Sequence, residues 1–331
     1  MFRSAVGGHG GPPYTNIENG RICRVGHRAD QDCIRRKRVT KFLQYVISGL
    51  STGSIYALVA LGLALIYRST RILNFAHGDI TTAGTFFAFM LLGFHFSFGL
   101  AFALAILFGS ALAMAFYFCI LVPAQRREAT QLGQIILTLG LGLIVQGLVA
   151  RFGGTDIQSF PFPLSDTKIY RFAGVVISEL SLGTLLVGLL ASLLFYLLVQ
   201  KTKLGLAMRA TSENLPAAQT MGIPTRQILA LSWGLAAMLG VLAGLFLAPA
   251  LLLDPFFMLE PFLKGFAAAT LGGLNSLPGA IVGGLILGVA ESLAGGYVSI
   301  AFKNTFAFLM IILVLLVRPE GLLGKEFKER V

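Results

Sequence analysis

Two apolar stretches separated by a polar loop decide the fold. LSLGTLLVGLLASLLFYLLV covers residues 180–199, and ILALSWGLAAMLGVLAGLFLAPALLL covers residues 228–253. Each supplies the roughly 20 apolar residues that an α-helix needs to cross a bilayer. The loop between them includes RATSENLPAAQTMGIPTRQ, residues 209–227, which mixes charges of both signs. The two stretches predict membrane-spanning helices, and the polar loop needs an explanation of its own.

The composition of the whole chain points the same way. Of 331 residues, 56% are hydrophobic and 12% are charged, and the mean hydropathy is +0.80. Soluble domains carry about 45–50% apolar and about 25% charged residues. The net charge of +11 could suggest nucleic acid, but the basic residues lie at the ends of apolar runs, as in proteins anchored in membrane lipid. We therefore exclude a nucleic-acid partner and predict an all-α, polytopic integral membrane protein.

Apolar runs recur along the chain from residue 42 onward. The run at 80–94 reaches spanning length only if its helix starts at NFAHGD, and the run at 262–274 is short and broken by glycines. The 39 glycines suit close approach of helix backbones within a membrane. We expect about 8–10 transmembrane helices, some glycine-rich and broken, from nine runs: 42–67, 80–94, 98–122, 132–152, 180–199, 228–253, 262–274, 279–297 and 305–317.

The first 40 residues differ from the rest. They are rich in Gly, Pro and polar groups and show no periodicity that could bury a face. We expect residues 1–40 to be a polar extension, disordered or a start-site artefact, and residues 41–331 to form the transmembrane domain. Cys23 and Cys33 lack the spacing of a zinc site, and Cys119 lies inside an apolar run. No metal site is predicted.

The lysines and arginines predict the orientation. Most of those in the loops lie on the side of the polar loop, which the positive-inside rule places in the cytoplasm. Nine spans then put the C-terminus inside and the N-terminus outside, where the basic residues of the first 40 positions oppose the rule. Either these residues are not part of the natural product or the number of spans differs by one. We expect residues 1 to about 38 to be absent from the working protein, with Val39 as a possible start.

The polar loop contains the signals of a short helix. Thr211, Ser212 and Asn214 are possible N-caps, and Pro216 suits only a first turn. Gly222, followed by Pro224, supplies a stop. The predicted helix, at about residues 215–221, is too short to be stable alone. Ala217, Ala218 and Met221 would give it a shallow apolar surface for another protein's groove. The alternative is an ordinary solvated loop.

Three further stretches favour the docking interpretation. They are NFAHGD (74–79), LGGLNSLPGAIVGGLILGVAE (271–291) and RPEGLLG (318–324). In this order and spacing, over about residues 42–324, the chain resembles the permease subunits of branched-chain amino acid ABC importers. The resemblance implies that the polar loop docks on a cytoplasmic ATPase, although Pro216 departs from the family's pattern. The coupling residues that we expect are Arg209, Glu213, Ala217, Ala218, Met221, Gly222 and Ile223.

The resemblance also implies a function and partners. The chain would carry branched-chain or related small amino acids across the bacterial inner membrane, as a multi-pass subunit. It would assemble with a second homologous permease, two cytoplasmic ATPase subunits and an extracytoplasmic substrate-binding protein. The chain contains no G-x-x-x-x-G-K-[ST] phosphate loop, so ATP would be bound by partner subunits and no cofactor is expected. No set of nucleophile, base and orienting group indicates an enzyme.

Polar residues inside the predicted spans are candidates for the translocation path. Intramembrane carboxylates are costly and usually functional, which singles out Asp79 and Glu291. Each has a structural alternative: Asn74 and Asp79 could cap a helix, His77 could be a structural hydrogen-bonding group, and Glu291 could pair with a backbone donor or Ser292. The tentative path residues are Asn74, His77, Gly78, Asp79, Asn275 and Glu291.

A rival function belongs to another class. An ion-coupled secondary transporter or channel for small polar solutes, including urea or amides, would use Asp79 and Glu291 as its ion site. Neighbouring genes for two ATPases and a secreted binding protein would favour the importer instead. The amino acid carried is not encoded in any of these motifs.

Overall fold

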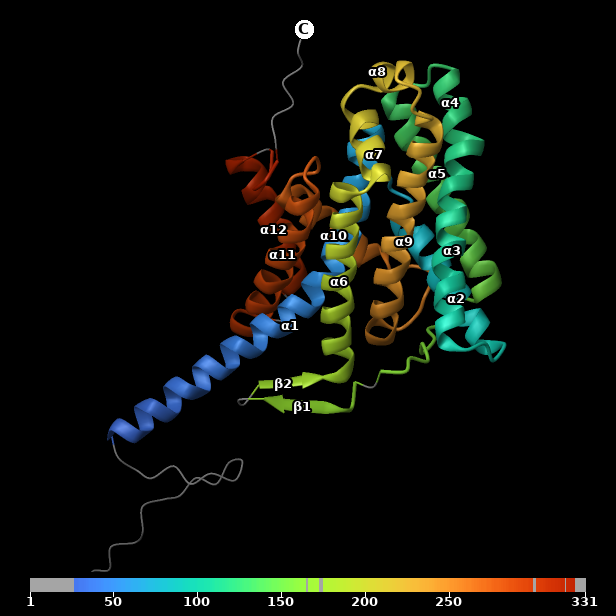
Figure 1. The fold of residues 1–331 in the computed structure, drawn as a ribbon. Coiled ribbons are helices and arrows are strands. Elements are labelled where there is room, and N and C mark those ends of the chain that lie inside the picture. The colour runs from blue at the N-terminus through green and yellow to red at the C-terminus, as the bar shows by residue number, and fades with distance from the viewer. Residues whose placement is uncertain (1–26, 165, 173–174, 300–301, 319, 325–331) are drawn as a thin grey trace, which may run out of the picture.

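A computed structural model describes residues 27–324, apart from 165, 173–174, 300–301 and 319. This part of the chain is almost wholly helical (Figure 1). The helical elements are α1 (His27–Thr70), α2 (His77–Gly93), α3 (Phe98–Phe116), the π-helical turn η1 (Tyr117–Leu121), α4 (Val122–Arg126), α5 (Gln131–Gly153), α6 (Glu179–Lys201), α7 (Lys203–Glu213), α8 (Leu215–Thr220), α9 (Thr225–Leu251), α10 (Leu259–Gly272), α11 (Leu277–Tyr297) and α12 (Phe302–Val317).

All nine predicted apolar runs fall on helices, which confirms the polytopic helical fold. Six helical segments are long and apolar enough to cross a membrane: 38–70, 98–126, 131–153, 179–201, 225–251 and 277–297. The other three runs form shorter helices, α2, α10 and α12, of 17, 14 and 16 residues. The helix α2 does begin within NFAHGD, as its run requires.

Two features of the fold were not predicted. Residues 27–40 belong to the 44-residue helix α1, where no helix was expected. They contain no Gly or Pro and include four Arg, a residue that favours helix. Residues 1–26 lie outside the described part. The second feature is an antiparallel hairpin of β1 (Ile169–Phe172) and β2 (Val175–Ser178), an addition to a fold predicted as all-α.

Two helices form the centre of the molecule. In the most apolar stretch of each helix, 89% of the residues of α1 and 61% of those of α9 are buried. The corresponding share is 28% for both α5 and α6. Figure 1 shows α1 running obliquely through the bundle. The largest buried side chains, Trp233, Leu58 and Leu61 among them, lie on these two helices. The helices α3, α5 and α6 therefore present most of their apolar surface outward, as helices facing lipid or a partner do.

Glycines bring α1 and α11 into backbone contact. A methyl group at Gly284 or Gly288 of α11 would overlap the backbone of Ala57 or Gly53 of α1. Gly49 and Gly53 face α11 in the same way, four residues apart. Both helices thus use the small-xxx-small spacing that lets membrane helices pack closely. The packing role predicted for the glycines of 271–291 is confirmed here.

The two ends of the bundle are chemically different. The elements α4, α7 and α8 lie at one end, and the hairpin β1–β2 lies at the other (Figure 1). Most of the basic loop residues belong to the first end, for example Arg126, Arg127 and Lys201. Gln44 lies near the start of the apolar part of α1. Its side-chain oxygen accepts a hydrogen bond from the Val176 N–H of β2 at 2.8 Å. This end of α1 therefore lies opposite the end that carries α8.

Candidate functional site

The polar loop folds into two short helices. The Thr202 side chain accepts a hydrogen bond from the Gly205 N–H at 3.1 Å and begins α7. The Asn214 side chain accepts one from the Ala217 N–H at 3.0 Å and begins α8, with Pro216 in the first turn. Gly222 then adopts a φ of 79°, in the left-handed region. The cap, the first-turn proline and the glycine stop are all confirmed, and α8 ends at Thr220, one residue before the predicted end.

The outward face of this segment differs from the predicted one. Ala218 is only 4% exposed, because it faces inward, whereas Met221 is 82% exposed. The exposed apolar side chains around Met221 are Leu215, Pro216 and Ala217. Glu213 is also exposed, and Ile223 packs against the core. Ala218 is therefore not part of the exposed apolar surface of this segment, whereas Leu215, 41% exposed, is.

Arg209 holds α7 in position. Its guanidinium donates hydrogen bonds to the side-chain oxygen of Gln200 at 3.1 Å and to the Gln200 carbonyl at 3.3 Å. Since Gln200 lies at the end of α6, the arginine fixes the angle between α6 and α7. This contact joins the polar loop to the end of a membrane-spanning helix.

The positive φ of Gly222 yields a prediction about this segment. A Gly222→Val variant is expected to reach the membrane normally but to lose most transport, because a β-branched residue is strained by about 1–2 kcal/mol in the left-handed region and would reshape the end of α8. No neighbouring atom lies within 4 Å of the added Cβ, so packing is not disturbed. Gly222→Asn is the control, since Asn tolerates this conformation. Equal transport by the valine and asparagine variants would contradict the prediction.

The chain is not helical between α1 and α2. The Asn74 side chain accepts a hydrogen bond from the Ala76 N–H at 3.1 Å, so it caps the turn before α2, not the helix itself. Thr138 of α5 accepts one from the Phe75 N–H at 3.2 Å. The His77 ring packs on Gly240, near the middle of α9. The helix α2 therefore begins beside the middle of α9, about half-way along that spanning helix.

His77 and Asp79, in the first turn of α2, contact different helices. His77 is 1% exposed, and neither ring nitrogen has a hydrogen-bond partner within the described residues. The expected hydrogen-bonding role of its ring is therefore not seen. Asp79 lies against Gly142 of α5, where a methyl group would overlap its carboxylate. Gly78 faces Phe262 in the first turn of α10, so the starts of α2 and α10 meet.

Two of the sequence motifs, and Arg71 just before the third, meet at the α10–α11 turn. Arg71, just before NFAHGD, donates to the Asn275 side chain at 3.0 Å. The N–H groups of Leu322 and Leu323 in RPEGLLG donate to the carbonyls of Leu271 and Gly272, at 2.8 and 3.0 Å. The motifs thus build one tightly held turn. Asn275 has a structural partner here, before the start of α11, and Glu291 lies about 21 Å further along that helix.

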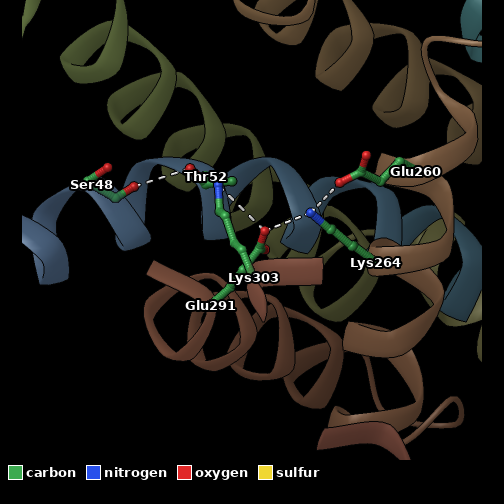
Figure 2. Close-up of polar contacts among 6 residues, drawn as sticks. All are labelled: Ser48, Thr52, Glu260, Lys264, Glu291 and Lys303. Carbon is green, nitrogen blue, oxygen red and sulfur yellow. Dashed lines mark hydrogen bonds and ion pairs between the residues drawn. The ribbon is translucent and has the colours of Figure 1, made fainter. Parts of the chain in front are cut away.

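Glu291 belongs to a network of four charges. Its Oε1 lies 2.6 Å from Nζ of Lys264 and 3.6 Å from Nζ of Lys303, and Lys264 also lies 2.6 Å from Oε1 of Glu260. Figure 2 shows Lys264 between the two carboxylates, with Lys303 approaching Glu291 from α12. The partner of Glu291 is therefore a lysine of α10, and the expected pairing with Ser292 or a backbone donor is wrong.

The predicted path residues do not form one site. Asn74, His77, Gly78 and Asp79 lie at the start of α2, Asn275 lies in the α10–α11 turn, and Glu291 lies in the charge network. Sequence reasoning missed Glu260, Lys264 and Lys303. Lys264 lies in the predicted run 262–274 but was not singled out, and it is buried in α10. The i,i+4 spacing of Glu260 and Lys264 was a signal that could have found this pair.

The fold and these features define a class of protein. Helices that begin within the membrane layer, beside polar groups and glycine-rich turns, are typical of transporters. The chain is therefore a multi-pass helical membrane protein with the architecture of a transport subunit.

Comparisons with known proteins then give the family. Residues 45–315 match the family described as branched-chain amino acid transport system / permease component. The chain is 32% identical over 304 residues to the high-affinity branched-chain amino acid transport system permease protein LivH of Salmonella typhimurium, covering 88% of this chain and 98% of the relative. It is likewise 32% identical to BraD of Pseudomonas aeruginosa over 305 residues, with the same coverage. The chain belongs to this permease family.

Proposed function

We propose that this chain is the permease subunit of an ABC importer that carries branched-chain amino acids across the bacterial inner membrane. The match to the permease family over residues 45–315 is the observation that carries the proposal. LivH of Salmonella typhimurium and BraD of Pseudomonas aeruginosa are both named for branched-chain amino acid transport. The chain covers 98% of each of them, so the comparison concerns whole subunits.

The chain itself would catalyse no reaction. Two cytoplasmic ATPases would bind and hydrolyse ATP, and an extracytoplasmic binding protein would deliver the amino acid to a pair of permeases. The exposed apolar group around Met221 on α8 suits a groove on an ATPase, since a short amphipathic helix is a common docking element. ATP binding would draw the two α8 segments together, and Arg209 would pass the movement to α6.

Reconstitution of the complete importer tests this proposal. Proteoliposomes holding the permeases and ATPases, supplied with the binding protein, are expected to accumulate labelled leucine only when ATP is present. Collapsing proton and sodium gradients with ionophores should leave the uptake unchanged. Uptake that needs an ion gradient and persists without ATP would support the ion-coupled transporter instead and overturn the proposal.

A further inference from the structure

We propose that Glu260 and Lys264 of α10 bind the two charges of the amino acid as it crosses the membrane. The α-ammonium group would bind the Glu260 carboxylate, and the α-carboxylate would bind the Lys264 ammonium. This inference rests on the proposed function, which it deepens by naming the residues that recognise the cargo. Four observations carry it: the geometry of the network, the difference in exposure, the balance of charge and the polar surface around it.

The geometry places one lysine between two unlike carboxylates. Nζ of Lys264 lies 2.6 Å from Oε1 of both Glu260 and Glu291. The Lys264 and Glu291 side chains are 5% and 1% exposed, whereas that of Glu260 is 56% exposed. Glu291 is therefore fixed within the protein and anchors Lys264. Glu260 is the member of the pair that solvent reaches, so its carboxylate can turn away from the lysine without becoming buried and unpaired.

The balance of charge suits a zwitterion. Glu260 and Glu291 carry two negative charges, and Lys264 and Lys303 carry two positive ones, so the network is neutral. An amino acid between Glu260 and Lys264 replaces one ion pair by two and adds no net charge. A molecule without a carboxylate would leave Lys264, which is 5% exposed, without its second negative partner, which is costly for a buried charge. The pair should therefore favour α-amino acids over the corresponding amines.

The surface around the pair is polar on one side and apolar on the other. Ser48 and Thr52 of α1 lie on the same side of the network (Figure 2), and the Lys303 side chain is 42% exposed. Charges facing lipid in a spanning region are rare and expensive, so this side must face water or protein in the assembled importer. Leu259 and Leu263 are 58% and 37% exposed. Each directly precedes a charged residue of the pair, and they can contact the aliphatic side chain of the cargo.

Removing the Glu260 charge tests the inference in the complete importer. Glu260→Gln is expected to lower leucine uptake by about tenfold to a hundredfold, because a charge-assisted hydrogen bond to the cargo is lost. Glu260→Asp should retain part of the uptake. The matched control is Glu179→Gln, which removes the carboxylate of another ion pair, 3.8 Å from Lys168 at the hairpin end. That control should transport normally.

A second measurement separates binding from structure. In a background with the three native cysteines replaced by serine, Glu260→Cys should react with a charged, membrane-impermeant thiol reagent, and leucine delivered by the binding protein should slow the reaction. The comparison on an outward-facing helix is Gly147→Cys on α5, which should stay unreactive. Unchanged uptake by Glu260→Gln, or labelling at position 260 that leucine does not slow, would overturn the inference.

The outcomes also separate this inference from the proposed function. If the unmodified importer shows no ATP-dependent leucine uptake, the proposed function fails, and the inference fails with it. If the unmodified importer transports leucine and Glu260→Gln transports it equally well, only the inference fails. Loss of uptake with unchanged membrane level and melting temperature supports both.

Discussion

Lys264→Met is expected to destabilise the protein by about 3–5 kcal/mol, the cost of leaving a buried charge without its partner. The substitution removes the ammonium group 2.6 Å from Glu291, whose side chain is 1% exposed. The remaining lysine near Glu291, Lys303, is 3.6 Å away and 42% exposed, so it compensates only in part. The detergent-purified chain should show a lower melting temperature and a lower yield from membranes than the unmodified chain.

A double variant shows whether the loss comes from the buried charge. Replacing a buried ion pair by apolar residues of similar volume is often neutral or stabilising. Lys264→Met combined with Glu291→Leu should therefore recover most of the stability that Lys264→Met loses. If Lys264 also binds the cargo, leucine uptake should stay low in the double variant. A double variant less stable than Lys264→Met would show that the pair does not act through its charges.

The same network bears on the rival transporter. An ion-coupling carboxylate must exchange its ion during each cycle. Glu291 is held at 2.6 Å by Lys264, and that lysine is itself buried in α10. Two lysines close to one carboxylate disfavour a further cation through charge repulsion. The arrangement therefore suits a fixed anchor better than a coupling-ion site.

Sequence patterns predicted those features that depend on neighbouring residues in the chain. The lengths of the apolar runs identified the helices, because a bilayer sets the number of apolar residues that a span needs. Asn214, Pro216 and Gly222 located α8, because a cap, a first-turn proline and a left-handed stop act within a few residues. In the same way, the glycine spacing of 284 and 288 indicated close helix packing.

Features that depend on distant contacts were missed or misplaced. Lys264 and Glu291 are 27 residues apart and meet only because α10 and α11 fold back on each other. The orientation of Ala218 depends on what α8 packs against, and no local pattern shows that. Composition suggested disorder up to residue 40, although residues 27–40 lack the glycines and prolines that precede them and extend α1. The hairpin β1–β2 is short and lies between two strong helical signals.

Gly288→Val on α11 is expected to impair folding severely. A side chain at this position would overlap backbone atoms of Gly53 and Gly49 on α1. Backbone atoms cannot turn aside as a flexible side chain can, so the two helices would have to separate. The helices α1 and α11 contact each other more extensively than any other pair of described elements, and their separation would open the centre of the bundle.

The size of this effect can be measured against a matched glycine. Overpacking typically costs about 1–3 kcal/mol and more where nothing can yield, so Gly288→Val should fall at or above the top of that range and leave little protein in the membrane. Gly147→Val on α5 makes the same chemical change in a spanning helix where no atom lies within 4 Å of the added Cβ. It should keep a near-normal melting temperature. Because both variants carry the same β-branched residue, helix propensity cancels in the comparison, and equal melting temperatures would show that α1 and α11 do not pack through these glycines.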